Sequence, residues 1–64
     1  NPARDQITLD SSLPSGDIFE IYSATGALSQ SGLLNTDRTI ILVQRTPGIY
    51  YIRYGGNIEK FILN

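Results

Sequence analysis

The stretch TPGIYYIRYGG, residues 46–56, contains the clearest strand in the sequence. Successive side chains of a strand point to opposite faces. The residues of one face are Tyr50, Ile52 and Tyr54, and those of the other are Ile49, Tyr51 and Arg53. A surface strand of a small domain normally alternates apolar with polar residues, whereas this one is apolar on both faces. We therefore expect one face to meet the core and the other to be covered by a loop, a strand or a partner.

Short strand signals recur along the whole chain, and helical periodicity is weak. The predicted strands cover residues 6–9, 17–23, 27–34, 38–43, 49–54 and 58–63. Gly26 suits a turn with positive φ, and Gly55-Gly56 suits a hairpin turn. The pattern predicts one all-β domain over residues 1–64, a small antiparallel β-sandwich (Ig-like, Greek-key type) of six to seven short strands. The strands over 38–43 and 49–54, apolar on both faces, are expected in the middle of their sheets.

The composition excludes several classes of chemistry. The 64 residues contain no cysteine and no histidine, so the usual zinc and copper ligands and the Ser-His and Cys-His nucleophile pairs are missing. The net charge of −1 is too balanced for binding driven by nucleic-acid phosphates. We expect no enzymatic activity, no cofactor and no metal. The absence of methionine leads us to expect a piece of a longer protein.

Three functional patterns compete with plain structural roles. Tyrosines 50, 51 and 54 would suit an aromatic platform for sugar or single-stranded nucleic acid, but tyrosine also favours strands, and Tyr50 is expected to bury its ring and bond its hydroxyl to nearby backbone. Arg45, Arg53 and Lys60 would suit an anion-docking patch, and Arg53 and Lys60 are expected as cross-strand neighbours. The carboxylates are scattered over turns, which argues against a glycosidase pair.

A series of short motifs runs through the chain in a characteristic order. They are Asn1-Pro2-Ala3, Ile21-Tyr22 with Gly26 and Leu28, Thr39-Ile40, Pro47-Gly48-Ile49-Tyr50 and finally Lys60-Phe61. This order resembles the type A C-terminal sorting domain of the type IX secretion system of Bacteroidetes, and the resemblance covers essentially the whole chain. Arg45 departs from the family, which usually has leucine there, and the chain stops at Leu63-Asn64 where a second lysine often follows.

The resemblance implies a compact β-sandwich at the end of an exported cargo protein. Such a domain is recognised by the outer-membrane translocon, and a sortase-like peptidase then usually removes it, so that cargo is released or attached to the cell surface. The implied location is secreted or cell surface, after passage through the periplasm. The family-like recognition residues are Gly26, Gly48, Tyr50, Arg53, Lys60, Phe61, Ile62 and Leu63.

Two further expectations follow from the strand pattern. An alternative function is an Ig-like spacer or a carbohydrate-binding β-module of a secreted or surface enzyme or adhesin, in which exposed tyrosines contact sugar. Small size and strands apolar on both faces also predict a weak homo-oligomer formed by edge-strand pairing.

Overall fold

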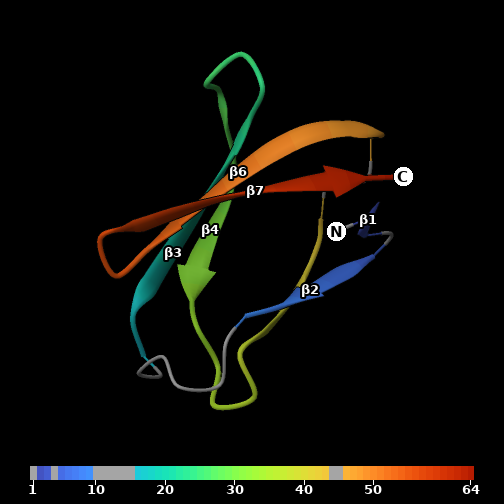
Figure 1. Cartoon of the computed structure of the whole chain (residues 1–64). Helices are drawn as coiled ribbons and strands as arrows, with labels where there is room; N and C mark the ends of the chain where they lie inside the picture. The colour runs from blue at the N-terminus through green and yellow to red at the C-terminus, as the bar shows by residue number, and fades with distance from the viewer. Residues whose placement is uncertain (1, 4, 10–15, 44–45) are drawn as a thin grey trace.

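The chain folds into seven strands without a helix in the described part (Figure 1). The computed structural model describes residues 2–3, 5–9, 16–43 and 46–64. The strands are β1 (Pro2–Ala3), β2 (Gln6–Thr8), β3 (Ile18–Ser23), β4 (Leu28–Leu33), β5 (Thr39–Ile41), β6 (Gly48–Tyr54) and β7 (Asn57–Leu63). These strands form a small β-sandwich, as the strand pattern predicts.

Two sheets of unequal size make up the sandwich. The larger sheet has the strand order β1-β7-β6-β3-β4, and the smaller sheet contains β2 and β5. All neighbours pair antiparallel except β1, which runs parallel to the end of β7 and places Pro2 opposite Ile62. Figure 1 accordingly shows β1 next to the C-terminal end of β7.

Glycines make the two tightest turns of the larger sheet. Gly55 and Gly56 join β6 to β7 with φ of +51° and +82°, which is the conformation of a two-residue type I′ hairpin turn. Gly26 lies in the turn between β3 and β4 with φ of +88°. Both positions require backbone that glycine adopts without steric cost, so the sequence prediction of these turns is confirmed.

The core lies between the two sheets and is entirely apolar or aromatic in the described residues. The buried residues are Leu9, Phe19, Ile21, Leu34, Ile40, Leu42, Tyr50, Ile52, Tyr54, Phe61 and Leu63. Most belong to β3, β6 and β7, where alternate side chains point inward. The alternation predicted for these strands is therefore confirmed, and the structure shows which of the two faces is buried.

Gln30 joins the two sheets through its side-chain amide. It projects from β4, donates from Nε2 to the carbonyl oxygen of Ile41 at 2.8 Å and accepts at Oε1 from the backbone N–H of Val43 at 3.0 Å. The Gln30 side chain thus bonds the two backbone groups that would otherwise pair with a further strand beside β5.

The predicted position of one strand needs correction, and one short strand was not predicted. The strand predicted over 38–43 is β5, and it lies in a two-stranded sheet rather than in the middle of one, with Ile41 and Val43 exposed. Only one face of the β2–β5 sheet packs on the core. The apolar residues that alternate with the packed ones therefore point to solvent. The very short β1 was not among the predicted strands, because two residues carry no alternation to read.

Candidate functional site

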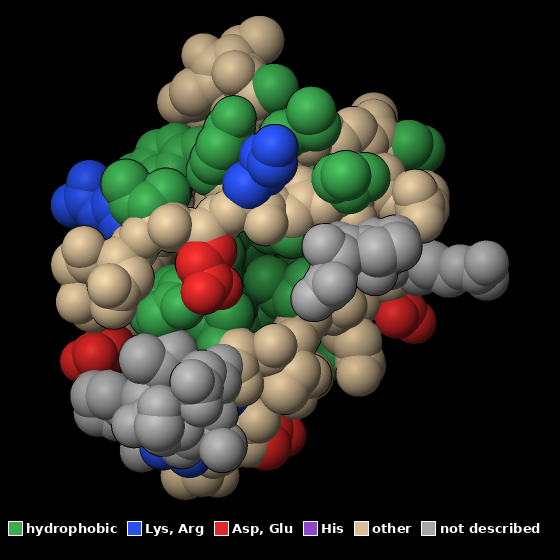
Figure 2. Space-filling model, viewed as in Figure 1, with side chains coloured by type: hydrophobic (Ala, Val, Ile, Leu, Met, Phe, Trp, Pro, Cys, Tyr) green, Lys and Arg blue, Asp and Glu red, His purple; other side chains and the backbone are tan. Residues whose placement is uncertain are grey.

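The outer face of the larger sheet carries an unusual number of exposed apolar side chains. Those on β3, β4, β6 and β7 are Ile18, Leu28, Leu33, Ile49, Tyr51, Ile58 and Ile62. Figure 2 shows hydrophobic side chains gathered over the surface that β6 and β7 occupy in Figure 1, with a basic side chain among them. Exposed apolar side chains gathered on one surface of a small protein are typical of an interaction site, and we call this surface of the larger sheet the outer face.

Register sets which outer-face residues lie together. Tyr22 on β3 is opposite Tyr51 on β6, and Tyr51 is in turn opposite Lys60 on β7. In the neighbouring row, Arg53 lies between Glu20 and Ile58. The outer face therefore has an aromatic pair at its centre and charged residues beside it.

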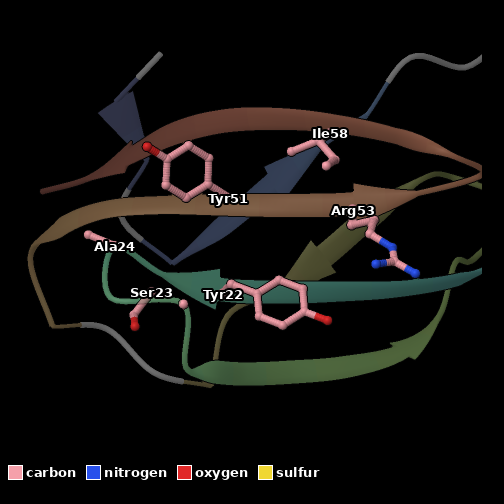
Figure 3. A pocket seen from close by; sticks show the side chains of 7 residues that line it. Tyr22, Ser23, Ala24, Tyr51, Arg53 and Ile58 are labelled. Atoms are coloured by element: carbon pink, nitrogen blue, oxygen red, sulfur yellow. The ribbon is translucent and has the colours of Figure 1, made fainter.

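A shallow hollow of about 370 Å³ lies beside this aromatic pair, at the end of the sheet where β3 turns into β4. It is lined by Tyr22, Ser23, Ala24, Gly26, Tyr51, Arg53 and Ile58. Figure 3 shows the side chains of Tyr22, Tyr51, Arg53 and Ile58 on the same side of the sheet. The lining suits an apolar group with a polar edge, because the aromatic rings are accompanied by a guanidinium and a hydroxyl.

Charged residues next to the hollow form a small network. The Nε of Arg53 lies 3.6 Å from Oε1 of Glu20. The Glu20 carboxylate also accepts a hydrogen bond from the Tyr22 hydroxyl, which raises the pKa of Tyr22 above its ordinary value, while the nearby Arg53 charge opposes the rise. Arg53 and Glu20 are too exposed for their ion pair to stabilise the fold appreciably.

The family-like residues separate into two groups in the structure. Tyr50, Phe61 and Leu63 are buried, whereas Arg53, Lys60 and Ile62 lie on the outer face. The two glycines are backbone positions: Gly26 lies in the β3–β4 turn, and Gly48 opens β6 with φ of +153°, which L side chains rarely adopt. Only the outer-face group is placed to contact a partner directly.

Tyr50 contributes to packing, as its sequence context predicts. Its ring stacks on that of Phe61 with centroids 5.6 Å apart and an interplanar angle of 17°. Its hydroxyl donates a 2.7 Å hydrogen bond to the carbonyl oxygen of Thr46. The predicted bond from this hydroxyl to nearby backbone is confirmed.

The aromatic platform of three neighbouring tyrosines is wrong. Tyr50 and Tyr54 are buried on the inner face, and Tyr51 alone of the three reaches the outer face. The aromatic neighbour of Tyr51 is instead Tyr22, which the sequence analysis did not place beside it because it lies on another strand. Only the cross-strand register, which depends on which strands become neighbours, identifies this pair.

The basic patch is also different from the prediction. Arg53 is opposite Ile58, and Lys60 is opposite Tyr51, so the two cations are not directly paired across the hairpin. They do share the outer face of the sheet. Arg45 lies outside the described residues, and its part in the patch stays a prediction.

Other kinds of site are not found where the structure describes the chain. The described residues contain no cluster of three or more acidic, cysteine or histidine side chains that would hold a metal ion. They also contain no helix of the length and hydropathy needed to cross a membrane.

Comparison of the chain with protein-family models, with curated proteins and with solved structures finds no match. Function is therefore inferred from the motif order and from the geometry of the outer face.

Proposed function

We propose that this chain is a C-terminal sorting domain that directs a cargo protein across the outer membrane by the type IX secretion system. The proposal assigns no chemistry to the domain. A translocon and then a sortase-like peptidase recognise its folded surface, and removal of the domain releases the cargo or leaves it attached to the cell surface. The location follows from this role, secreted or at the cell surface after passage through the periplasm.

The observation that carries the proposal is that the two faces of the β6–β7 hairpin differ: one is buried in the core and the other is exposed. The hairpin is the last part of the chain, and its inner residues supply nearly half of the buried core. Its outer residues Ile49, Tyr51 and Ile62 are exposed apolar side chains next to Lys60. A recognition module needs this combination, because a rigid body must present an apolar surface that stays available.

Binding through the outer face uses the charges for orientation rather than for most of the affinity. Lys60 and Arg53 lie among the apolar side chains of the outer face and are exposed. Exposed charges at an interface act mainly on the association rate and on the choice of partner. The apolar side chains supply the area that the partner removes from water.

Fusion of residues 1–64 to the C-terminus of a periplasmic reporter in a Bacteroidetes host tests the proposal. The reporter is expected in the medium or on the cell surface, and to stay periplasmic in a strain without the translocon. A fusion with Tyr51→Ser and Ile62→Ser tests the outer face, since both residues are exposed and the domain should still fold. The proposal is wrong if the unmodified fusion folds and stays in the periplasm.

A second function is favoured by the hollow between Tyr22 and Tyr51. Sugar rings stack on exposed aromatic side chains, and Arg53 and Ser23 would offer hydrogen bonds at the edge. In this alternative the domain is a carbohydrate-binding module of a secreted or surface protein. Glycan-array binding that is lost in Tyr51→Ala but kept in Tyr54→Phe, where the ring stays in the core, would favour it over the sorting role.

A further inference from the structure

The edge of β7 has backbone groups that no described strand pairs. The two-residue turn makes Tyr54 and Asn57 the closing hydrogen-bonded pair of the hairpin, and hydrogen-bonded pairs then alternate along β7. The N–H and C=O groups of Ile58 and Lys60 therefore point away from β6. The strand β1 pairs only with Ile62 and Leu63, which leaves the edge over residues 57–61 open in the described structure.

The space beside this edge is hollow and apolar. In Figure 1, β1 lies below the C-terminal end of β7, so a strand that continued the sheet would run along the same side of β7. In Figure 2 this region is a hollow with hydrophobic side chains at its bottom and an acidic side chain at its rim. A strand added here would lie over the edge of the apolar core.

The side chains along the open edge of β7 determine which residues a partner strand needs. Glu59 is on the same face as the buried Phe61, and Lys60 is on the outer face with Ile58. Directly opposed residues of antiparallel strands interact on their shared face, favourably for opposite charges and unfavourably for like charges. A complementary strand thus has an acidic residue opposite Lys60, a basic residue opposite Glu59 and an apolar residue opposite Ile58.

We propose that the β7 edge over residues 57–61 binds an antiparallel strand of a partner protein with this order, acidic, basic, apolar, from its N- to its C-terminal end. Backbone hydrogen bonds to Ile58 and Lys60 hold the partner strand on β7. Its acidic, basic and apolar side chains determine which strands bind. The inference rests on the geometry of β7 and is independent of the proposed role in secretion.

A second copy of the chain fits this edge poorly. A two-fold pairing that uses the free groups of Ile58 and Lys60 must centre on the residue between them, so that Glu59 lies opposite Glu59 of the second copy. Two carboxylates directly opposed across strands repel each other. Glu59 therefore protects the edge against self-association, as charged residues do on many edge strands, and leaves it available to a partner with a basic residue.

The test uses two short peptides of identical composition. An acetylated and amidated peptide Val-Glu-Lys-Val-Thr places its charges opposite Lys60 and Glu59 in the favourable order, and Val-Lys-Glu-Val-Thr places them opposite like charges. Titration into the ¹⁵N-labelled chain, followed by amide chemical shifts, should give saturable shifts at Ile58 and Lys60 with a millimolar dissociation constant. We expect the second peptide to bind about tenfold more weakly, because two favourable pairs become two unfavourable ones.

A charge-exchanged chain provides the matched control. The double substitution Glu59→Lys and Lys60→Glu changes only exposed residues, and it should reverse the preference between the two peptides. The proposal is overturned if the peptides bind the original chain equally, if neither causes saturable shifts, or if the shifts appear on the outer face at Tyr22 and Tyr51 instead.

Discussion

The two faces of β6 are built from similar residues but differ in how much of their side-chain surface is exposed. On the inner face Ile52 is 1% exposed, whereas Ile49 on the outer face is 43% exposed. Likewise the ring of Tyr50 is buried against Phe61, whereas Tyr51 lies open on the sheet surface opposite Tyr22. Alternation along a strand separates the two sets, but nothing in the residue types decides which set is covered.

The difference shows how a very small domain uses its apolar residues. A two-stranded sheet covers only one face of a five-stranded one, so the other face stays exposed. Inner residues stabilise the fold, and outer residues of the same type are available for binding at little cost to stability. The predictions below test this separation, from the largest expected change to the smallest.

Ile52→Ala should cause the largest loss of stability. Removing a fully buried isoleucine side chain leaves a cavity and costs about 2–5 kcal/mol, a large share for a domain of this size. We expect urea denaturation, followed by circular dichroism, to show a largely unfolded chain. Ile49→Ala is the matched outer-face variant, and a similar loss there would contradict the separation of the two faces.

Gly32→Ala should destabilise the inner face by overpacking. A Cβ at Gly32 would lie 3.2 Å from two atoms of the Phe19 ring, so the ring must shift. We expect this crowding to outweigh the lower backbone entropy of alanine in the unfolded chain and to lower the urea midpoint. Ser31→Ala, on the outer face of the same strand, is the control, and an unchanged midpoint for Gly32→Ala would show that the ring moves without cost.

Tyr50→Phe should have a moderate effect, because the ring and its stacking on Phe61 remain. Only the hydrogen bond from the hydroxyl to the carbonyl oxygen of Thr46 is lost, which costs about 0.5–1.5 kcal/mol. Thermal unfolding monitored by circular dichroism measures the change. Tyr51→Phe on the outer face should unfold at the temperature of the original chain, and a larger loss there than in Tyr50→Phe would be inconsistent with the structure.

Ile58→Thr should leave stability almost unchanged. The side chain is 67% exposed on the outer face, and substitutions at such positions usually change the free energy of unfolding by less than about 0.5 kcal/mol. Threonine also keeps the β-branched shape that strands favour. A loss as large as that of Ile52→Ala in the same denaturation experiment would mean that the outer face is packed against something in the isolated chain.

Tyr22 gives a pH effect that is confined to alkaline solution. Its pKa is raised chiefly by the hydrogen bond to Glu20, so the folded chain holds this proton more tightly than the unfolded chain. The contribution to stability is complete below the unfolded pKa of about 10 and is lost as pH rises through the higher folded pKa. Titration of ¹³C-labelled tyrosine by NMR should show a lower Tyr22 pKa in Glu20→Gln, and an unchanged value would exclude the hydrogen bond as the cause.

Much of the fold was predictable because strand alternation and turn glycines act locally. The division of β3, β6 and β7 into two alternating faces and the Gly55-Gly56 turn followed from the sequence. The site was less predictable, since it depends on neighbours across strands. Tyr22 became part of the hollow because β3 pairs with β6 in the register that places it opposite Tyr51.

The sequence by itself determined that this chain is an all-β body with no cysteine or histidine chemistry, because composition and the period of two are properties of the chain alone. The tertiary structure decided which face of each strand became the core, how Gln30 joins the two sheets, and that no described strand pairs with the β7 edge beyond β1. These features depend on contacts between residues far apart in the chain. Such contacts exist only once the unequal sheets have packed together.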